Sequence, residues 1–305
     1  MNGTSFQSDI KYWLKQGNAV NHLLFWNILV FVVVGLVNVL AFFSGSFGMV
    51  SVFLSDKLAL HSFYPTLLRQ PWGVFTYMFT HEGLFHLFFN MLNLYWFGNL
   101  FRSFLGNQRV LPVYILGSLA GALAFVLAFN YLPTLQPFVA HATLIGASAS
   151  VMCLLVSCAT LTPNYEIGLL FIGSIRLKWL ALAIVVLDLI TIPYANPGGM
   201  FAHLGGALLG FSYIKLLQGG RDMAAPLVYL FDKLGNRPRI TLKPKVQQHR
   251  KAGNFKPKKS PLRVIKKEEN PQRHLDELLD KINERGYHSL SSDEKAFLEK
   301  FSKEN

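Results

Sequence analysis

The sequence predicts an all-α, polytopic membrane protein with six transmembrane helices, followed by a small soluble helical hairpin. Two observations support this prediction. Of the 305 residues, 51% are hydrophobic and only 15% are charged, which is typical of membrane proteins rather than soluble ones. The charges are also unevenly placed: residues 1–214 hold 8 Lys or Arg and 5 Asp or Glu, whereas residues 215–305 hold 21 and 12. A hydrophobic body with few charges therefore precedes a basic tail.

Six apolar runs have roughly the length that a bilayer core requires of a helix, about 20 residues. They are residues 22–43, 74–99, 110–130, 142–161, 177–192 and 199–218. We expect residues 1–21 to be a cytoplasmic segment and residues 22–218 to form the six-span domain. Another apolar stretch, residues 167–175, is interrupted by two glycines, so we expect it at the membrane interface instead of across the bilayer.

Basic residues predict the orientation of these spans, because cytoplasmic loops carry an excess of Lys and Arg. Such residues precede the first span and recur in every second loop after it. They are Lys11, Lys15, Arg102, Arg109, Arg176, Lys178, Lys215 and Arg221. The loops 131–141 and 193–198 have none, while the long aromatic loop 44–73 carries Lys57 and Arg69. We therefore expect both termini in the cytoplasm and the loop 44–73 partly in the outer interface.

Polar side chains collect near one depth of the predicted bundle. The second span contains HEGLFHLFFN, in which His86 and Asn90 are four residues apart and share a helix face. The fourth span brings Ser148 to a similar depth, and the sixth span brings His203. Because polar and ionisable groups are costly within a membrane, such a gathering indicates function.

This set of side chains contains what acyl transfer requires. A serine hydroxyl becomes a good nucleophile when a base takes its proton, and each donor to the resulting oxyanion contributes about 3–4 kcal/mol. Ser148 can supply the nucleophile and His203 the base. His86, Asn90 and the backbone N–H of Ser148 can supply the donors. The alternative for each residue on its own is a role in helix packing through local or interhelical hydrogen bonds.

Small residues on the sixth span predict that it packs closely against another helix. Ala202, Gly206 and Gly210 recur every four residues, which is the pattern that lets two helix backbones approach each other in a membrane. A hydrogen bond between Ser148 and a base on the sixth span needs such an approach. Gly146 would thin the fourth span at the same level.

Asp188 is the acidic residue of the fifth span and lies at about the depth of Ser148. The order Ser148, Asp188, His203 along the chain allows a catalytic triad in which the acid orients the histidine. The other possibility is an interfacial or interhelical hydrogen bond without a catalytic role, and the sequence favours this second interpretation.

Three motifs, in order along the chain, resemble those of the rhomboid family of intramembrane serine proteases. HEGLFHLFFN resembles the motif of the second span, in which a His and an Asn four residues later serve the oxyanion. GASA resembles the GxSG nucleophile motif, and AHLGGALLG resembles the AHxxGxxxG motif around the base. The resemblance covers roughly residues 20–218 and implies a six-transmembrane-helix rhomboid-like bundle.

The resemblance implies roles for individual residues. It makes Ser148 the nucleophile and His203 the base of a dyad without an acid, and it places His86 and Asn90 in the oxyanion hole. The residues that would shape the site are His81, Gly146, Ala149 and Gly206. The implied reaction is cleavage of transmembrane segments of membrane proteins in the lipid bilayer, near the outer leaflet, with no cofactor and no metal.

The sequence departs from the family pattern at three places. Ala149 stands where the family has Gly, Gly73 follows Trp72 where many members have Arg, and Arg102 stands where an acid is often seen. None of these changes removes the dyad, so we expect activity. Since some bacterial members carry a similar C-terminal hairpin, we expect the bacterial inner membrane as the location.

Three other functions agree less well with the sequence. An intramembrane metalloprotease needs two His four residues apart on one helix face, whereas His81 and His86 are five apart. A catalytically inactive rhomboid-like protein that binds membrane clients would be expected to lack Ser148 or His203. A channel or transporter would place its polar cluster at the midplane between repeated halves, not near one surface.

The segment 219–271 is predicted to be a basic, disordered cytoplasmic linker. Between residues 221 and 267 there are 14 Lys or Arg and 2 Asp or Glu, a composition that favours disorder. Such a segment can contact anionic lipid or can be a plain soluble linker. We expect no nucleic-acid partner, because aromatic residues are not interleaved with the basic ones.

Residues 272–305 are predicted to form a helical hairpin. From Leu275 onward, apolar residues fall at i, i+3, i+4 and i+7, the spacing of an amphipathic helix. Ser291 and Glu294 then have the spacing of a capping box that begins a second helix.

Overall fold

The computed structural model describes residues 17–169, 173–194, 196–234, 291 and 293–295. The chain divides into two units, Met1–Ile240 and Thr241–Asn305. In the second unit, the backbone N–H of Ser291 donates to Oε2 of Glu294 (2.7 Å), and the N–H of Glu294 donates to Oγ of Ser291 (3.3 Å). These reciprocal bonds confirm the predicted capping box. The helix predicted from Leu275 lies outside the described residues.

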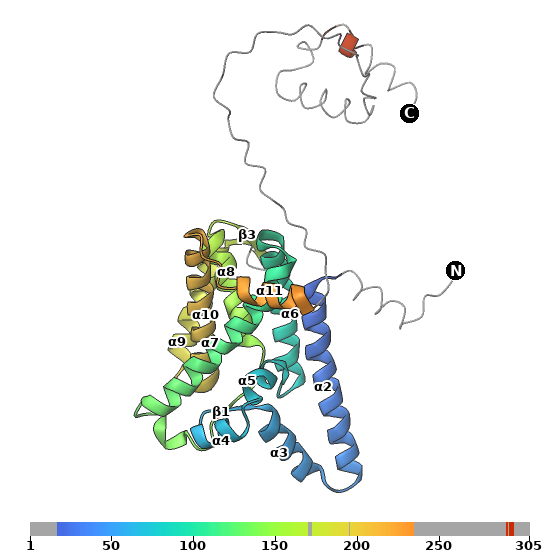
Figure 1. Cartoon of the computed structure of the whole chain (residues 1–305), viewed down its shortest axis with the longest axis vertical. Coiled ribbons are helices and arrows are strands. Elements are labelled where there is room, and N and C mark those ends of the chain that lie inside the picture. Colours follow the sequence, from blue (N-terminus) through green and yellow to red (C-terminus); the bar gives the residue numbers. More distant parts are fainter. Residues whose placement is uncertain (1–16, 170–172, 195, 235–290, 292, 296–305) are drawn as a thin grey trace, which may run out of the picture. The chain divides into compact units, whose positions relative to one another are not determined.

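Six helices of the first unit follow the six predicted apolar runs in order (Figure 1). They are α2 (Ala19–Phe43), α6 (Leu84–Leu105), α7 (Val110–Tyr131), α8 (Ser148–Leu161), α9 (Leu177–Thr191) and α10 (Pro197–Gln218). Within the described residues, three helical segments are long and apolar enough to cross a membrane: Ala19–Phe43, Asn107–Tyr131 and Pro197–Gln218. Three of the six expected spans therefore have both the length and the composition of a membrane-crossing helix.

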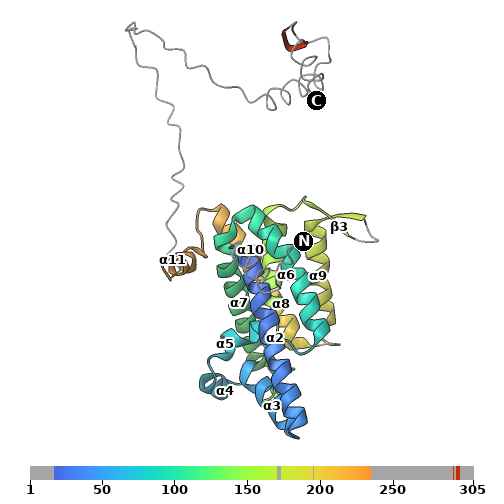
Figure 2. The same cartoon turned by 90° about the vertical axis from the view of Figure 1, so that its right-hand side faces the viewer.

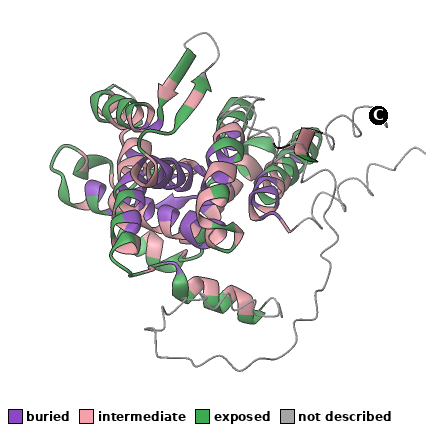
Figure 3. Ribbon diagram, turned by 90° about the horizontal axis from the view of Figure 1, so that it is seen from above, coloured by how far each residue is buried: buried purple, intermediate pink, exposed green. Residues whose placement is uncertain are grey.

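Helices α7, α8 and α10 pack against one another (Figure 2), and the buried residues gather toward the middle of the bundle (Figure 3). Small residues make the contacts between these helices. A Cβ atom on Gly121 of α7 would lie 2.5 Å from the Cβ of Ala149 on α8. A Cβ atom on Gly206 of α10 would overlap the carbonyl oxygen of Ala149, and one on Gly210 would overlap that of Cys153. The predicted close approach of the sixth helix is therefore confirmed, because these positions leave no room for any side chain.

Large apolar side chains cover the outside of the bundle. Leu40 of α2 is 70% exposed, Phe85 of α6 is 79% exposed and Leu208 of α10 is 68% exposed. Polar side chains such as Asn27 are instead buried, and Nδ2 of Asn27 donates a hydrogen bond to the carbonyl of Leu23 (2.8 Å). This distribution suits lipid, in which apolar surface faces acyl chains and internal polar groups need partners within the protein.

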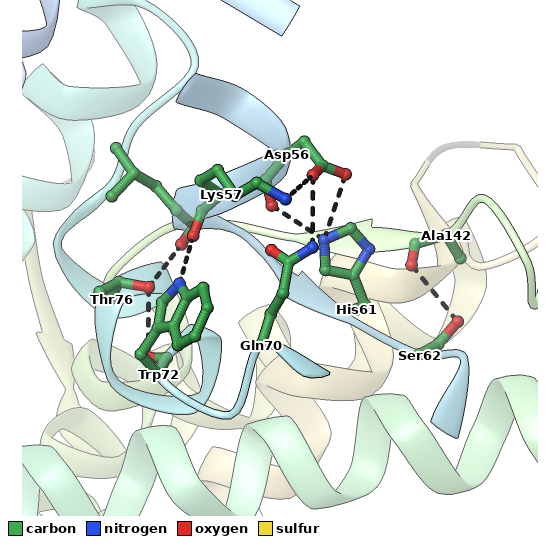
Figure 4. A network of polar contacts seen from close by, with 9 residues as sticks. Asp56, Lys57, His61, Ser62, Gln70, Trp72, Thr76 and Ala142 are labelled. Atoms are coloured by element: carbon green, nitrogen blue, oxygen red, sulfur yellow. Dashed lines mark hydrogen bonds and ion pairs between the residues drawn. The ribbon is translucent and has the colours of Figure 1, made fainter. Parts of the chain in front are cut away.

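The segment between α2 and α6 folds into short elements. They are α3 (Phe47–Leu58), β1 (Leu60–His61), α4 (Tyr64–Arg69), α5 (Gly73–Thr76) and the 3-10 helix η1 (Tyr77–Phe79). Nε1 of Trp72 donates to the carbonyl of Lys57 at 2.8 Å (Figure 4). Gly73 approaches Ala59 so closely that a Cβ atom would lie 2.6 Å from the carbonyl oxygen of Ala59. Trp72 and Gly73 therefore anchor this segment without the arginine that the family resemblance implied.

Asp56 joins two further side chains of the same segment (Figure 4). Its Oδ2 accepts a hydrogen bond from Nζ of Lys57 at 3.1 Å, and Nε2 of His61 lies 2.8 Å from its carbonyl oxygen. The Lys57 hydrogen bond lowers the pKa of the Asp56 carboxyl, so this group is charged at neutral pH. The polar groups of the segment thus pair mainly with one another.

A two-stranded sheet links this segment to the residues that precede Ser148. β1 pairs antiparallel with β2 (Thr143–Leu144), and the N–H of Gly146 donates to the carbonyl of Tyr77 (2.8 Å). The backbone of Gly146 has a φ of 118°, a conformation that a helix cannot contain. For this reason α8 begins at Ser148, and the prediction that the fourth helix starts at residue 142 was wrong.

A β-hairpin precedes α9. It consists of β3 (Glu166–Leu169) and β4 (Gly173–Arg176), with Ile167 opposite Ile175. The apolar stretch 167–175 was expected at the membrane interface. Residues 167–169 and 173–175 of this stretch lie in the two strands.

Helix α11 (Ala225–Leu234) corrects the prediction that residues 219–271 are disordered throughout. Arg109 and Asp222 hold the chain at the start of this helix, since Nε of Arg109 donates to Oδ2 of Asp222 at 2.9 Å. The basic charge that favours disorder is concentrated after α11, whereas the helix itself is largely apolar. Averaging the charge over the whole segment therefore concealed the helix.

Candidate active site

Ser148 is the first residue of α8. The N–H groups of the first turn of a helix, including that of Ser148, have no partner within the helix. The N-terminus of the helix also carries a partial positive charge. The hydroxyl of Ser148 therefore lies at the helix end whose free N–H groups and partial positive charge stabilise a nearby negative charge.

Four of the predicted site residues line one cavity of about 280 Å³. His86 and Asn90 come from α6, Ser148 comes from α8 and His203 comes from α10. Much of the remaining wall is apolar and includes Phe89, Phe97, Val151, Met152, Leu155 and Ile184. Three helices that are distant in the sequence thus bring a hydroxyl, two imidazoles and a carboxamide to the same space.

Gly146 allows His86 to approach Ser148. A Cβ atom on Gly146 would lie 2.8 Å from Nε2 of His86 and 3.8 Å from Oγ of Ser148. The space beside Ser148 is therefore free because residue 146 has no side chain, and Nε2 of His86 borders it. A donor to an oxyanion formed at Ser148 would have to lie in this region.

His203 has a partner on the neighbouring helix. Its Nδ1 lies 3.1 Å from Oδ2 of Asp188 on α9, and both residues line the cavity. Asp188 thus makes an interhelical contact, and its partner is His203, the residue that a triad would require. No hydrogen bond joins Ser148 to His203 in the described part of the chain. Such bonds are often long in the absence of substrate and shorten when it binds.

Asn90 and His81 are buried beside His86. Nδ2 of Asn90 donates to the carbonyl of His86 (2.9 Å), which occupies one of its two N–H bonds and leaves the other. The ring of His81 lies edge-on to that of His86, with centroids 5.1 Å apart. Both ring nitrogens of His81 are buried without a hydrogen-bond partner among the described residues. His81 packs against His86 and does not belong to the cavity lining.

Two other predicted site residues lie at helix contacts and not in the cavity. Ala149, which replaces the glycine of the family motif, packs its methyl group against Gly121 of α7. Gly206 faces the carbonyl oxygen of Ala149. The neighbouring hydroxyl of Ser150 is buried and donates to the carbonyl of Tyr114 (2.7 Å), so it has a structural partner.

Sequence reasoning disfavoured one feature of this site and missed another. The first is the contact between Asp188 and His203: the order of the residues and the acid within an apolar helix allowed it, but no spacing rule relates the two residues, and the sequence favoured a hydrogen bond without a catalytic role. The second is the hydrogen bond from Gly146 to the carbonyl of Tyr77, which involves only backbone atoms and leaves no trace in side-chain chemistry.

Residues 68–219 match the model of the rhomboid domain family. The chain is a member of the rhomboid family. The matched region contains the cavity residues of α6, α8, α9 and α10. This rhomboid is 28% identical over 155 residues to "RHOMBOID-like protein 12, mitochondrial" of Arabidopsis thaliana. The aligned residues make up 48% of this chain and 46% of that protein. It is 29% identical over 168 residues to "Presenilin-associated rhomboid-like protein A, mitochondrial" of Danio rerio. Here the aligned residues make up 52% of this chain and 41% of that protein.

A third relative is "Inactive RHOMBOID-like protein 8" of Arabidopsis thaliana. The two are 32% identical over 84 residues, which is 28% of this chain and 24% of that protein. This rhomboid therefore matches less than half the length of each of these relatives. Residues 265–304 match a family of unknown function, DUF6576.

We expect His86→Ala and Asn90→Ala each to lower kcat by about 10²-fold without abolishing cleavage of a substrate. A donor stabilises the oxyanion only as charge develops in the transition state, so kcat should fall more than KM rises. The double variant should be slower than either single variant, but by less than the product of the two effects, because donors to one oxygen act as a unit.

The control for these variants is Asn99→Ala, because Nδ2 of Asn99 also donates to a backbone carbonyl four residues earlier on α6, that of Tyr95 (2.7 Å). Asn99 lies outside the cavity lining, and its replacement should leave kcat unchanged. Single-turnover rates and melting temperatures are measured on the same samples. Lower melting temperatures with unchanged rates would assign His86 and Asn90 to helix packing alone.

Proposed function

We propose that this rhomboid is an intramembrane serine endopeptidase that cleaves transmembrane segments of other membrane proteins near the outer leaflet. The proposal rests on the one cavity that Ser148, His203, His86 and Asn90 share. A hydroxyl, an imidazole base and two donors around one space are the groups that peptide hydrolysis requires. Largely apolar walls suit a hydrophobic segment as the substrate. The proposed reaction uses no metal and no cofactor.

In the proposed reaction, Nε2 of His203 takes the proton of Ser148 while Oγ attacks the scissile carbonyl carbon. The carbonyl oxygen becomes an oxyanion that the start of α8, His86 and Asn90 stabilise. When the C–N bond breaks, the protonated His203 gives its proton to the leaving amine. Water then attacks the acyl-enzyme, again with His203 as the base, and releases Ser148.

We place all six helices of this rhomboid in the bacterial inner membrane, with both termini in the cytoplasm. The distribution of Lys and Arg supports this orientation, and three of the helices have the composition of membrane spans. With this orientation the N-termini of α6, α8 and α10 face the outer side. Since Ser148 begins α8, cleavage would occur on that side of the bilayer.

The alternative is a catalytically inactive rhomboid-like protein that binds membrane clients. The relative named inactive favours this alternative. Such a protein would bind a transmembrane segment and leave it intact, so that wild type and Ser148→Ala would behave alike.

The test is cleavage of a single-span reporter protein by the purified full-length chain in liposomes. Wild type is expected to release two fragments and to be labelled covalently by a fluorophosphonate probe, whereas Ser148→Ala should do neither. A wild-type preparation that unfolds cooperatively, yet neither cleaves the reporter nor reacts with the probe, would sink the endopeptidase proposal and favour client binding.

Removal of the chain from residue 235 onward is expected to leave reporter cleavage in detergent within a few fold of the full-length rate. All residues that line the cavity lie between His86 and His203, and the truncation keeps α11 with its Arg109–Asp222 ion pair. If the basic tail contacts anionic lipid, truncation should weaken binding only to liposomes that contain such lipid. A folded truncation without any activity would contradict this prediction.

A further inference from the structure

We infer that Asp188 is the positioning residue for His203, so that this rhomboid works with a Ser148–His203–Asp188 triad. The inference rests on the proposed function, because it assigns a role to a residue of the same cavity. It differs from the dyad without an acid that the family resemblance implied.

The geometry supports a specific contact between the two side chains. Nδ1 of His203 lies 3.1 Å from Oδ2 of Asp188, and the two side chains are 21% and 13% exposed. A carboxylate in an apolar helix needs a partner, because a charge without one is costly in a membrane. In the described part of the chain no Lys or Arg pairs with Asp188, and His203 supplies its side-chain contact.

The contact determines which nitrogen of His203 can act as the base. An ionised carboxylate only accepts hydrogen bonds, so the proton of neutral His203 is held on Nδ1. Nε2 then carries the lone pair that takes the proton of Ser148. When that proton has moved, the Asp188 carboxylate keeps its charge and stabilises the imidazolium, as in Ser-His-Asp hydrolases.

Asp188 lies in the second half of α9, which is otherwise weakly buried. The buried residues of α9 are Leu177 and Ala181, both in its first half. Around Asp188 the apolar side chains are exposed, including Leu187 at 59% and Ile190 at 59%. Asp188 is thus an inward-facing polar group of this part of α9, together with Thr191, whose hydroxyl lies 3.6 Å from Sδ of Met200 on α10. The same contact could also simply hold α9 against α10, and the test has to separate these two roles.

The decisive variant is Asp188→Asn, measured with the full-length protein and the single-span reporter. A carboxamide can donate as well as accept, so it no longer fixes the tautomer of His203, and it has no charge to stabilise the imidazolium. We expect kcat to fall by about 10²- to 10⁴-fold with KM nearly unchanged. The melting temperature should stay close to that of wild type, because the carboxamide can still bond across the two helices.

Asp188→Glu keeps an acceptor-only group and should recover at least part of the kcat that Asp188→Asn loses. Leu187→Ala, a change at the exposed neighbouring position of α9, should leave kcat and KM unchanged. A purely structural contact predicts the opposite pattern. Asp188→Asn would then cleave at the wild-type rate, and Asp188→Ala would lower only the melting temperature.

A measurement without substrate keeps the inference separate from the proposed function. In ¹⁵N-histidine-labelled protein, the signal of His203 is identified by its loss in His203→Ala. It should report protonation at Nδ1 in wild type and a shift toward protonation at Nε2 in Asp188→Asn. The same tautomer in both proteins would overturn the inference, even if wild type cleaves the reporter. The expected tautomers in a protein that cleaves nothing would overturn the endopeptidase proposal and the catalytic use of the triad, while the orientation of His203 by Asp188 would stand.

Discussion

Ser148→Ala is expected to give a folded protein that cleaves a single-span reporter no faster than background. Ser148 would form the covalent bond to substrate, and removal of the nucleophile in a well-studied serine protease lowers kcat by about 10⁶-fold. The hydroxyl of Ser148 makes no hydrogen bond among the described residues, so its loss should leave the melting temperature unchanged. Reporter cleavage and thermal unfolding of the same sample measure both effects.

His203→Ala should abolish cleavage to the same extent, and the double variant with Ser148→Ala should be no worse than either single variant. The two residues act as one unit, so their effects are not additive. The control is Ser150→Ala, which removes a buried hydroxyl two residues away that donates to the carbonyl of Tyr114. It should cost about 1 kcal/mol of stability while cleavage in the folded fraction continues. Near-wild-type turnover of Ser148→Ala or His203→Ala would show that the dyad is wrongly assigned.

Gly206→Ala is expected to remove activity through the fold. The added methyl group would overlap the carbonyl oxygen of Ala149, which is backbone and cannot turn away as a side chain can. Helices α8 and α10 must then move apart, which separates Ser148 from His203. Overpacking of a well-packed core typically costs about 1–3 kcal/mol, and a backbone contact places this site at the upper end. Thermal unfolding and reporter cleavage should both show the loss.

Gly35→Ala is the matched control for Gly206→Ala, because Gly35 lies within helix α2 and a Cβ atom there would meet nothing within 4 Å. Alanine is favoured over glycine in a helix by about 1 kcal/mol. We therefore expect Gly35→Ala to be neutral or slightly stabilising, with normal cleavage. If Gly206→Ala were equally harmless, α8 and α10 would not be in backbone contact.

The sequence predicted the order of the helices and the extent of some of them, whereas the second run, 74–99, begins ten residues before α6 at 84–105. The third run, 110–130, corresponds to α7 at 110–131, and the fifth, 177–192, corresponds to α9 at 177–191. The reason is that both ends of a long apolar run in a membrane protein are marked by polar or charged residues. The four-residue spacing of small residues around Gly206 was equally informative, because two helix backbones can come into contact only where small residues recur along one helix face.

Other features could not be predicted, because the deciding interactions connect distant parts of the chain. Residues 143–147 are apolar or small, like a helix, and the hydrogen bond from Gly146 to Tyr77 keeps them out of one. Helix α11 was concealed by the basic residues that follow it. The roles of Ser148, His203, His86 and Asn90 stay predictions, although the structure places all four around one cavity.

The contact between helix backbones at Gly206 affects how a substitution scan of this protein identifies catalytic residues. In a scan of all substitutions scored by reporter cleavage, Gly121, Gly206 and Gly210 should accept as few replacements as Ser148, since each faces atoms that a Cβ would overlap or crowd. Intolerance alone would then rank these glycines beside the nucleophile. A parallel score for protein abundance should separate the two sets, because replacements of Ser148 leave the protein in the membrane and replacements of the glycines deplete it.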